Sequence, residues 1–140
     1  MASEAYRESG VDLDRMNGVK ERIKGFAAST HGPEVLDSSG SFAGLYQLSG
    51  YRQPVLVAST DGVGTKVAIA QAIDKHDTIG IDLVGMVVDD IVVVGAKPLF
   101  MTDYIACGKV VPERIADIVA GIAHGCSETG TALVGGETAE

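Results

Sequence analysis

The longest apolar stretch of the chain, HDTIGIDLVGMVVDDIVVVGA at 76–96, sets the strongest limit on the fold. It is apolar on nearly every side, so other elements have to cover most of it. Periodicity alone does not distinguish a buried helix from a buried strand here. The length of the stretch, the capping residues Asp77 or Thr78 and the terminal Gly95 favour a buried helix.

Helical and extended patterns alternate along the rest of the 140 residues, a length typical of one domain. Alternating elements of this kind predict an α/β fold, with a mixed sheet flanked by helices. Residues 1–11 are expected to form a mobile arm, and 31–44 have the composition of turns. We predict helices from Asp12 or Asp14 to about Ala28, over 66–73, and from Pro112 to a stop at Gly130, and strands at 45–48, 54–58, 98–107 and 131–136.

The composition argues against several classes of partner. The formal net charge is −8, and an acidic surface repels the phosphate backbone, so we expect no nucleic-acid partner. No apolar run is long enough to cross a membrane, and the first ten residues lack the pattern of a signal peptide. The two cysteines, Cys107 and Cys126, have no metal-ligand spacing and are expected to be reduced. These features predict a cytoplasmic protein.

Three acids lie beside apolar elements, where an unpaired charge is costly. Asp61 follows the predicted strand at 54–58, Asp90 lies within the apolar stretch 76–96, and Glu137 follows the predicted strand at 131–136. Carboxylate oxygens suit Mg²⁺, which takes one or two carboxylates and completes its shell with water and phosphates. The three acids therefore suggest a nucleotide and metal site assembled from strand-end loops.

Glycines next to two of these acids would let a ligand approach the backbone. They are Gly62 and Gly64 in STDGVGTK, which continues with Thr65 and Lys66, and Gly135 and Gly136 before Glu137. The chain has neither the Gly-Lys-Ser/Thr of a P-loop nor the Gly-x-Gly-x-x-Gly of a dinucleotide site, so the sequence supports neither of these two nucleotide-binding motifs.

Simpler interpretations remain open for each residue taken alone. An Asp-Gly pair such as that at Asp61 is commonly a turn, and Asp90 can lie on the wet side of a helix. Glu137 can be a solvated loop residue. Lys24 and Lys66 can contact ATP phosphates, but they can equally be surface lysines.

Five stretches, in order, resemble the N-terminal half of the aminoimidazole ribonucleotide synthetase family, also called phosphoribosylformylglycinamidine cyclo-ligase. They are GVDLDRMNGVKERIK, PVLVASTDGVGTK, HDTIGIDLVGM, GAKPLFMTDYIACGK and LVGGETAE. The resemblance runs from about Tyr6 to Glu140. It implies that residues 1–140 correspond to an N-terminal domain for ATP binding, metal binding and dimerisation, and that the second domain of the family is absent.

The resemblance implies an ATP- and Mg²⁺-dependent ligase of purine biosynthesis. Such an enzyme closes the imidazole ring of formylglycinamidine ribonucleotide and gives aminoimidazole ribonucleotide, ADP and phosphate. By this likeness Asp61, Asp90 and Glu137 are metal ligands, and Lys24 lies near the nucleotide. Asp89 stands where the family usually has Asn, which leaves the composition of the metal shell open. The nucleotide-binding set that the resemblance implies comprises Lys24, Asp61, Gly62, Gly64, Thr65, Lys66, Gly135 and Gly136.

The resemblance also implies a homodimer in which two copies close a shared barrel, and a glycine-rich loop, SSGSFAG, that closes over the ligand. The residues that catalyse ring closure cannot be assigned from this segment. Two other functions stay open. One is a small-molecule kinase of the same superfamily, of the thiamine-monophosphate kinase or selenophosphate synthetase type, and the other is a non-catalytic dimerisation module.

Overall fold

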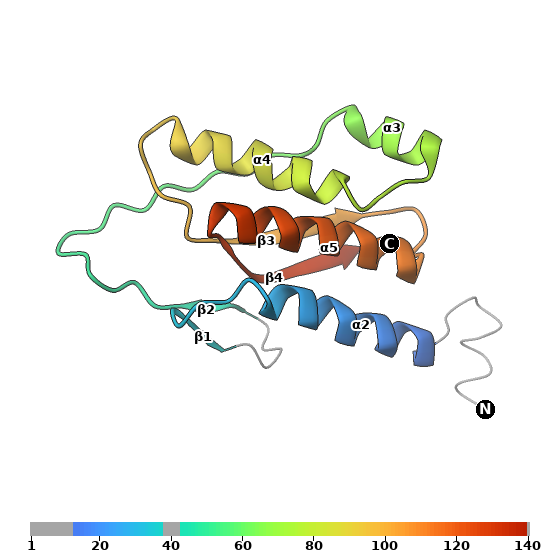
Figure 1. Ribbon diagram of the computed structural model, residues 1–140, viewed down its shortest axis with the longest axis horizontal. Coiled ribbons are helices and arrows are strands. Elements are labelled where there is room, and N and C mark those ends of the chain that lie inside the picture. Colours follow the sequence, from blue (N-terminus) through green and yellow to red (C-terminus); the bar gives the residue numbers. More distant parts are fainter. Residues whose placement is uncertain (1–12, 38–42, 140) are drawn as a thin grey trace.

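A computed structural model of the chain describes residues 13–37 and 43–139 (Figure 1). Helices and short strands alternate over most of this range, which confirms the predicted α/β class. In chain order the elements are α2 (Leu13–Ala28), β1 (Val35–Asp37), β2 (Leu45–Tyr46), α3 (Lys66–Ile73), α4 (Ile79–Val92), β3 (Phe100–Ala106), α5 (Pro112–Thr129) and β4 (Ala132–Ala139).

The centre of the fold is a unit formed by β3, α5 and β4. The two strands pair in parallel, from Phe100 opposite Ala132 to Ala106 opposite Ala139. Parallel neighbours need a crossover connection, and α5 supplies it. As predicted, this helix begins at Pro112, and it is capped by Gly130 in the left-handed conformation, with φ of 66°.

Helix α5 carries most of the hydrophobic core. In Figure 1 it lies over the β3–β4 pair, with α4 on one side and α2 on the other. Its apolar face meets side chains from α4 and from both strands, and Ile122 and Cys126 are fully buried. The core cluster consists of Val84, Met101, Ile115, Val119, Ile122, Cys126 and Leu133.

Glycine allows α4 and α5 to approach each other closely. A Cβ on Gly121 of α5 would overlap the carbonyl oxygen of Asp77, and one on Gly80 of α4 would overlap that of Ile118. The stretch predicted as a buried helix over 76–96 is therefore a helix where it meets α5. It is shorter than predicted, since α4 ends at Val92, and Val93 and Val94 are exposed.

The end of α2 is tied to β4 by side chains that mimic a neighbouring strand. The Leu133 N–H donates to Thr30 Oγ1 at 2.9 Å. His31 Nε2 donates to the Leu133 carbonyl oxygen at 2.7 Å. These two bonds satisfy the outer edge of β4 at one residue and fix the distance between α2 and the strand.

The predicted strand at 54–58 is wrong. Residues 51–63 form no strand, and 54–58 make no backbone hydrogen bond to any described residue. The Val55 side chain is 88% exposed and that of Leu56 67%. An apolar run becomes a strand only beside a partner strand, and no described segment of this chain lies there as one.

Three other expectations need correction. The region 31–44, expected to consist of turns, contains strand β1, which pairs antiparallel with β2. The strand expected at 45–48 is β2, and it covers only Leu45–Tyr46. The described strands form two separate pairs, not one mixed sheet. Strand β4 continues to Ala139, because its pairing with β3 extends that far, so Glu137 belongs to a strand and not to the loop after one.

The remaining predicted elements are confirmed within a few residues: α2, α3 over Lys66–Ile73, and β3 within 98–107. The predicted arm at 1–11 and most of the loop SSGSFAG lie outside the described residues. Within 13–37 and 43–139, no helix combines the length and hydropathy needed to cross a membrane.

Candidate functional site

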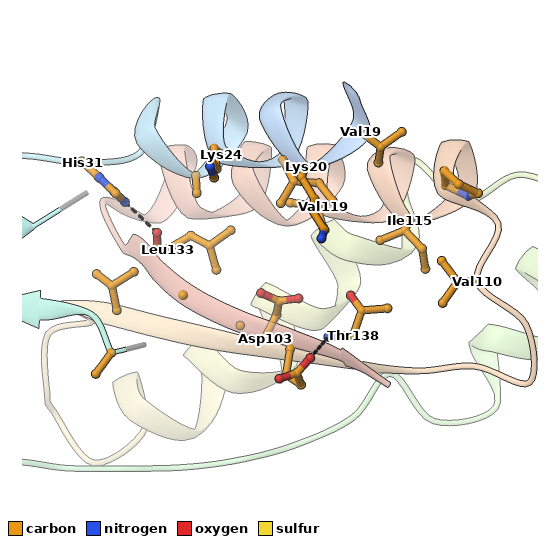
Figure 2. Close-up of a pocket in the computed structure, with 18 residues that line it drawn as sticks. Val19, Lys20, Lys24, His31, Asp103, Val110, Ile115, Val119, Leu133 and Thr138 are labelled. Atoms are coloured by element: carbon orange, nitrogen blue, oxygen red, sulfur yellow. Dashed lines mark hydrogen bonds between the residues drawn. The ribbon is translucent and has the colours of Figure 1, made fainter. Parts of the chain in front are cut away.

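A pocket of about 540 Å³ lies between α2 and the β3–β4 pair (Figure 2). Its α2 wall contains Lys20 and Lys24, and its opposite wall contains the β4 stretch from Leu133 to Thr138. Most of the remaining lining is aliphatic, contributed by α2 and α5. Four residues of the predicted nucleotide and metal set line this one pocket: Lys24, Gly135, Gly136 and Glu137.

Two of these four residues, Lys24 and Glu137, have side chains, and local bonds hold both. Lys24 Nζ pairs with Glu21 Oε1 at 2.9 Å, one turn back on α2, and both side chains are mostly exposed. Such a pair is weak and leaves the ammonium group available to a ligand. Glu137 Oε1 accepts a hydrogen bond from the Thr138 N–H at 3.0 Å.

A second group of predicted residues surrounds the loop STDGVGTK. Ser59 Oγ donates to Asp90 Oδ2 at 2.5 Å, which fastens the start of the loop to α4. Asp61 Oδ1 accepts from the Gly62 N–H at 2.7 Å. Gly64 has a φ of 64°, so glycine is the residue that fits this turn without strain. The structure thus brings the loop that carries Asp61 to the helix that carries Asp90.

Lys66 begins α3 and pairs with Asp82 of α4 at 2.8 Å. Thr65 occupies the N-cap position of α3, without a side-chain capping bond. The lysine therefore has a partner within the chain that competes with any phosphate. Its side chain is 44% exposed, so solvent screens this pair.

The three predicted metal ligands do not form one cluster. Nowhere in the described part of the chain do three His, Cys, Asp or Glu side chains lie close enough together to hold one ion. Glu137 lines the pocket, whereas Asp61 and Asp90 do not. The predicted residues are thus divided between the pocket and the STDGVGTK loop.

Asp103 of β3 is the pocket residue that the sequence reasoning did not single out. Burial raises the pKa of its carboxyl to about 6. Burial, and to a lesser extent the charge of Asp103, raise the pKa of the Cys126 thiol to about 12, which fits the prediction of a reduced, structural cysteine. A signal was present in the sequence: alternation along β3 puts Asp103 on the same face as the buried Met101 and the half-buried Ile105.

Comparison with known proteins defines the class. The chain belongs to the family described as AIR synthase related protein, N-terminal domain, whose model matches residues 40–140. The resemblance inferred from the five stretches is thereby confirmed.

Curated relatives carry one more specific name. Proteins named phosphoribosylformylglycinamidine cyclo-ligase from Geobacillus sp. (strain WCH70) and Oceanobacillus iheyensis are 57% and 55% identical to this chain over 140 residues, which is 99% of it. The protein of that name from Carboxydothermus hydrogenoformans is 58% identical over 137 residues, or 96% of the chain. The chain spans 40% to 41% of the length of these relatives.

Proposed function

We propose that this chain is the N-terminal, ATP- and metal-binding domain of a phosphoribosylformylglycinamidine cyclo-ligase. The reaction would close the imidazole ring of formylglycinamidine ribonucleotide, with ATP converted to ADP and phosphate, in the cytoplasm as a step of purine biosynthesis. The observation that carries the proposal is the identity of 55% to 58%, over 96% or more of the chain, to proteins of that name. In such a protein the chain supplies one wall of the site, and the remaining 60% of the relatives' length supplies the rest.

The donor groups around the STDGVGTK loop fit a magnesium–phosphate group. Asp61 and Asp90 supply hard oxygen ligands, and Mg²⁺ needs only one or two of them. A bound Mg²⁺ would neutralise charge on phosphate oxygens. The space beside Gly62 and Gly64 is open, since a Cβ at either position would meet nothing within 4 Å, and neither residue adds a side chain next to Asp61. Glu137 is proposed as the third ligand, reached only if the metal cluster extends toward the pocket.

Within the proposed site the chain's own residues bind and orient. Lys24 would exchange its weak bond to Glu21 for a phosphate oxygen. Lys66 would do the same at the cost of its bond to Asp82, while the Thr65 hydroxyl and an N–H group of the Gly135–Gly136 pair supply uncharged donors. Holding two phosphorylated ligands in fixed positions is the main contribution that such a domain makes to the rate.

We also propose that two copies associate through the segment 54–58 and the end of α4, and close a shared barrel. The supporting observation is a set of exposed apolar side chains, in particular Val55, Leu56 and Val57, on backbone whose N–H and C=O groups bond to no described residue. Val93 and Val94, which follow α4, are also apolar and exposed. A second copy offering the same segment would satisfy both the apolar surface and the backbone groups. Sedimentation of the parent chain and of its Leu56→Asp variant tests the proposed dimer. We expect a dimer for the parent and a monomer for the variant, and a monomer in both cases would refute the proposal.

A chimera tests the catalytic proposal. This chain would replace the matching segment of the Geobacillus sp. (strain WCH70) relative, and ring closure would be followed with formylglycinamidine ribonucleotide, ATP and Mg²⁺. We expect activity close to that of the unmodified relative. Asp61→Asn should lower kcat at least about tenfold, which corresponds to roughly 1.4 kcal/mol of transition-state stabilisation. Lys24→Ala should raise the KM for ATP.

The control variant is Asp117→Asn, which removes an exposed carboxylate of α5 outside the pocket. A folded chimera without ring closure would refute the proposal. Phosphorylation of thiamine monophosphate by that chimera would favour the kinase alternative. Binding of neither nucleotide nor substrate, with dimerisation retained, would leave the dimerisation module.

A further inference from the structure

The pocket between α2 and the β3–β4 pair has a carboxylate at its floor. Figure 2 shows the Asp103 side chain rising from β3 into the space beneath α2. Around it the pocket is lined mainly by aliphatic residues, among them Ile115, Val119 and Leu133, all buried. A carboxylate in such surroundings loses hydration, which is costly unless another group replaces the water.

No described side chain provides that replacement. Asp103 forms no ion pair, and its only hydrogen-bonding partner among the described residues is its own backbone N–H. Lys20 extends from α2 toward the same space in Figure 2, but the two make no ion pair. Lys24 is paired with Glu21 instead. The carboxylate therefore keeps most of its capacity to accept hydrogen bonds and faces an open cavity.

The backbone opposite is shaped around this carboxylate. Asp103 lies directly across from Gly136 in the β3–β4 register. A Cβ on residue 136 would overlap Asp103 Oδ1 and would lie 2.6 Å from Asp103 Cγ. Any residue other than glycine at 136 would displace the acid, so the glycine acts as a positioning residue for it.

The missing partner should be a cation or a donor with two N–H groups, because those are the groups that a desolvated carboxylate binds best. The substrate in the proposed function carries such a group: an amidine, which is protonated near neutral pH and presents two N–H donors in a plane. The two lysines of the α2 wall are unsuited to that group and suited to phosphate oxygens.

We propose that Asp103 binds the amidine of the substrate through a two-pronged, charge-assisted hydrogen bond, with Gly136 keeping the carboxylate in place. This inference rests on the proposed function and adds the residue that recognises the reacting nitrogen end of the substrate. It gives the pocket a direction: amidine toward β3, phosphate-bearing groups toward α2. It also makes Asp103 the determinant that separates an amidine from the corresponding amide.

The test compares two ligands that differ only in that group. Calorimetry on the chimera would measure the Kd of formylglycinamidine ribonucleotide and of the analogue whose amidine is replaced by a carboxamide. A lost charge-assisted hydrogen bond is worth roughly ten- to hundredfold in affinity. We expect the parent to prefer the amidine by that factor, and Asp103→Asn and Gly136→Ala to lower the preference to about threefold or less. Asp117→Asn, the matched control, should keep the parent's preference.

Steady-state kinetics add a measurement that would not change if Asp103 had a purely structural role. Asp103→Asn should raise the KM for the amidine substrate and leave the KM for ATP unchanged. An Asp103→Asn variant that keeps the parent's preference for the amidine, while circular dichroism shows it folded, would overturn the inference.

The 140-residue chain itself offers a second, independent measurement. Acetamidinium and acetamide would be titrated into it, with the carboxyl carbon of Asp103 observed by NMR. Acetamidinium should shift that signal and acetamide should not. Equal responses would refute the role of Asp103 even if the chimera proved active. An inactive chimera whose Asp103 signal responds to acetamidinium alone would refute the proposed reaction and leave the amidine site supported.

Discussion

Replacing Asp103 by asparagine is expected to stabilise the folded chain at pH 8, and progressively less at lower pH. Burial raises the pKa of this carboxyl from its usual 3.8 to about 6. The folded state thus holds the proton more tightly than the unfolded state, so the ionised carboxylate opposes folding. The cost is absent below pH 3.8, grows as the pH rises toward 6, and is complete above 6.

The magnitude follows from the difference between the two pKa values. A shift from 3.8 to about 6, at about 1.4 kcal/mol for each pH unit, gives an upper limit of about 3 kcal/mol. Roughly 2 kcal/mol of this is recovered by pH 4.5, because the folded carboxyl is then mostly protonated. The stabilisation by Asp103→Asn should accordingly be about 2 kcal/mol larger at pH 8 than at pH 4.5.

Urea unfolding of both proteins at a series of pH values measures this difference. Any change in packing between Asp and Asn is common to all pH values and cancels in the comparison. Asp117→Asn, on the exposed side of α5, gives the baseline for removing one carboxylate. A free-energy difference between Asp103→Asn and the parent that does not vary with pH would refute the reasoning about the buried charge.

Four further variants test the packing. Gly121→Ala should destabilise the chain by about 1–3 kcal/mol, because α4 leaves no room for a Cβ there. Gly85 faces open space, so Gly85→Ala should be neutral or stabilising. Thermal unfolding of the two variants measures the difference. Ile122→Ala in the fully buried core should cost about 2–5 kcal/mol in urea unfolding, and a cost below 1 kcal/mol would contradict the assigned core. Thr30→Val should cost about 1 kcal/mol and speed hydrogen exchange at the Leu133 amide; unchanged exchange would mean that this bond does not hold the strand edge.

The helices could be predicted from the sequence because local chemistry determines them. Pro112 and Gly130 mark the ends of α5 by their own backbone preferences, and apolar spacing identifies its buried face. The strands depended on partners. Strand β4 runs past Gly136 because β3 continues beside it, whereas 54–58, although more apolar, has no described partner and forms no strand.

The candidate site could be predicted only in part, for a related reason. Motif spacing led to Lys24, Gly135, Gly136 and Glu137, which line one pocket. It gave no means of telling that Asp61 and Asp90 lie elsewhere, since that depends on how α4 packs. Asp103 was missed although it lies in the family-like stretch GAKPLFMTDYIACGK, because only its alternation with Met101 and Ile105 along β3 marks it as facing inward.

The segment 54–58 has a consequence for the life of the newly made chain. It is apolar and exposed, it forms no strand, and its backbone bonds to no described residue, so a chaperone or a protease can bind it without unfolding other elements. If two copies associate through this segment as proposed, pairing would cover it, and a copy without a partner would leave it open to cleavage. Limited digestion with a protease that cuts after aliphatic residues should therefore cleave the purified chain within 54–58 before it cleaves within the buried helix α5.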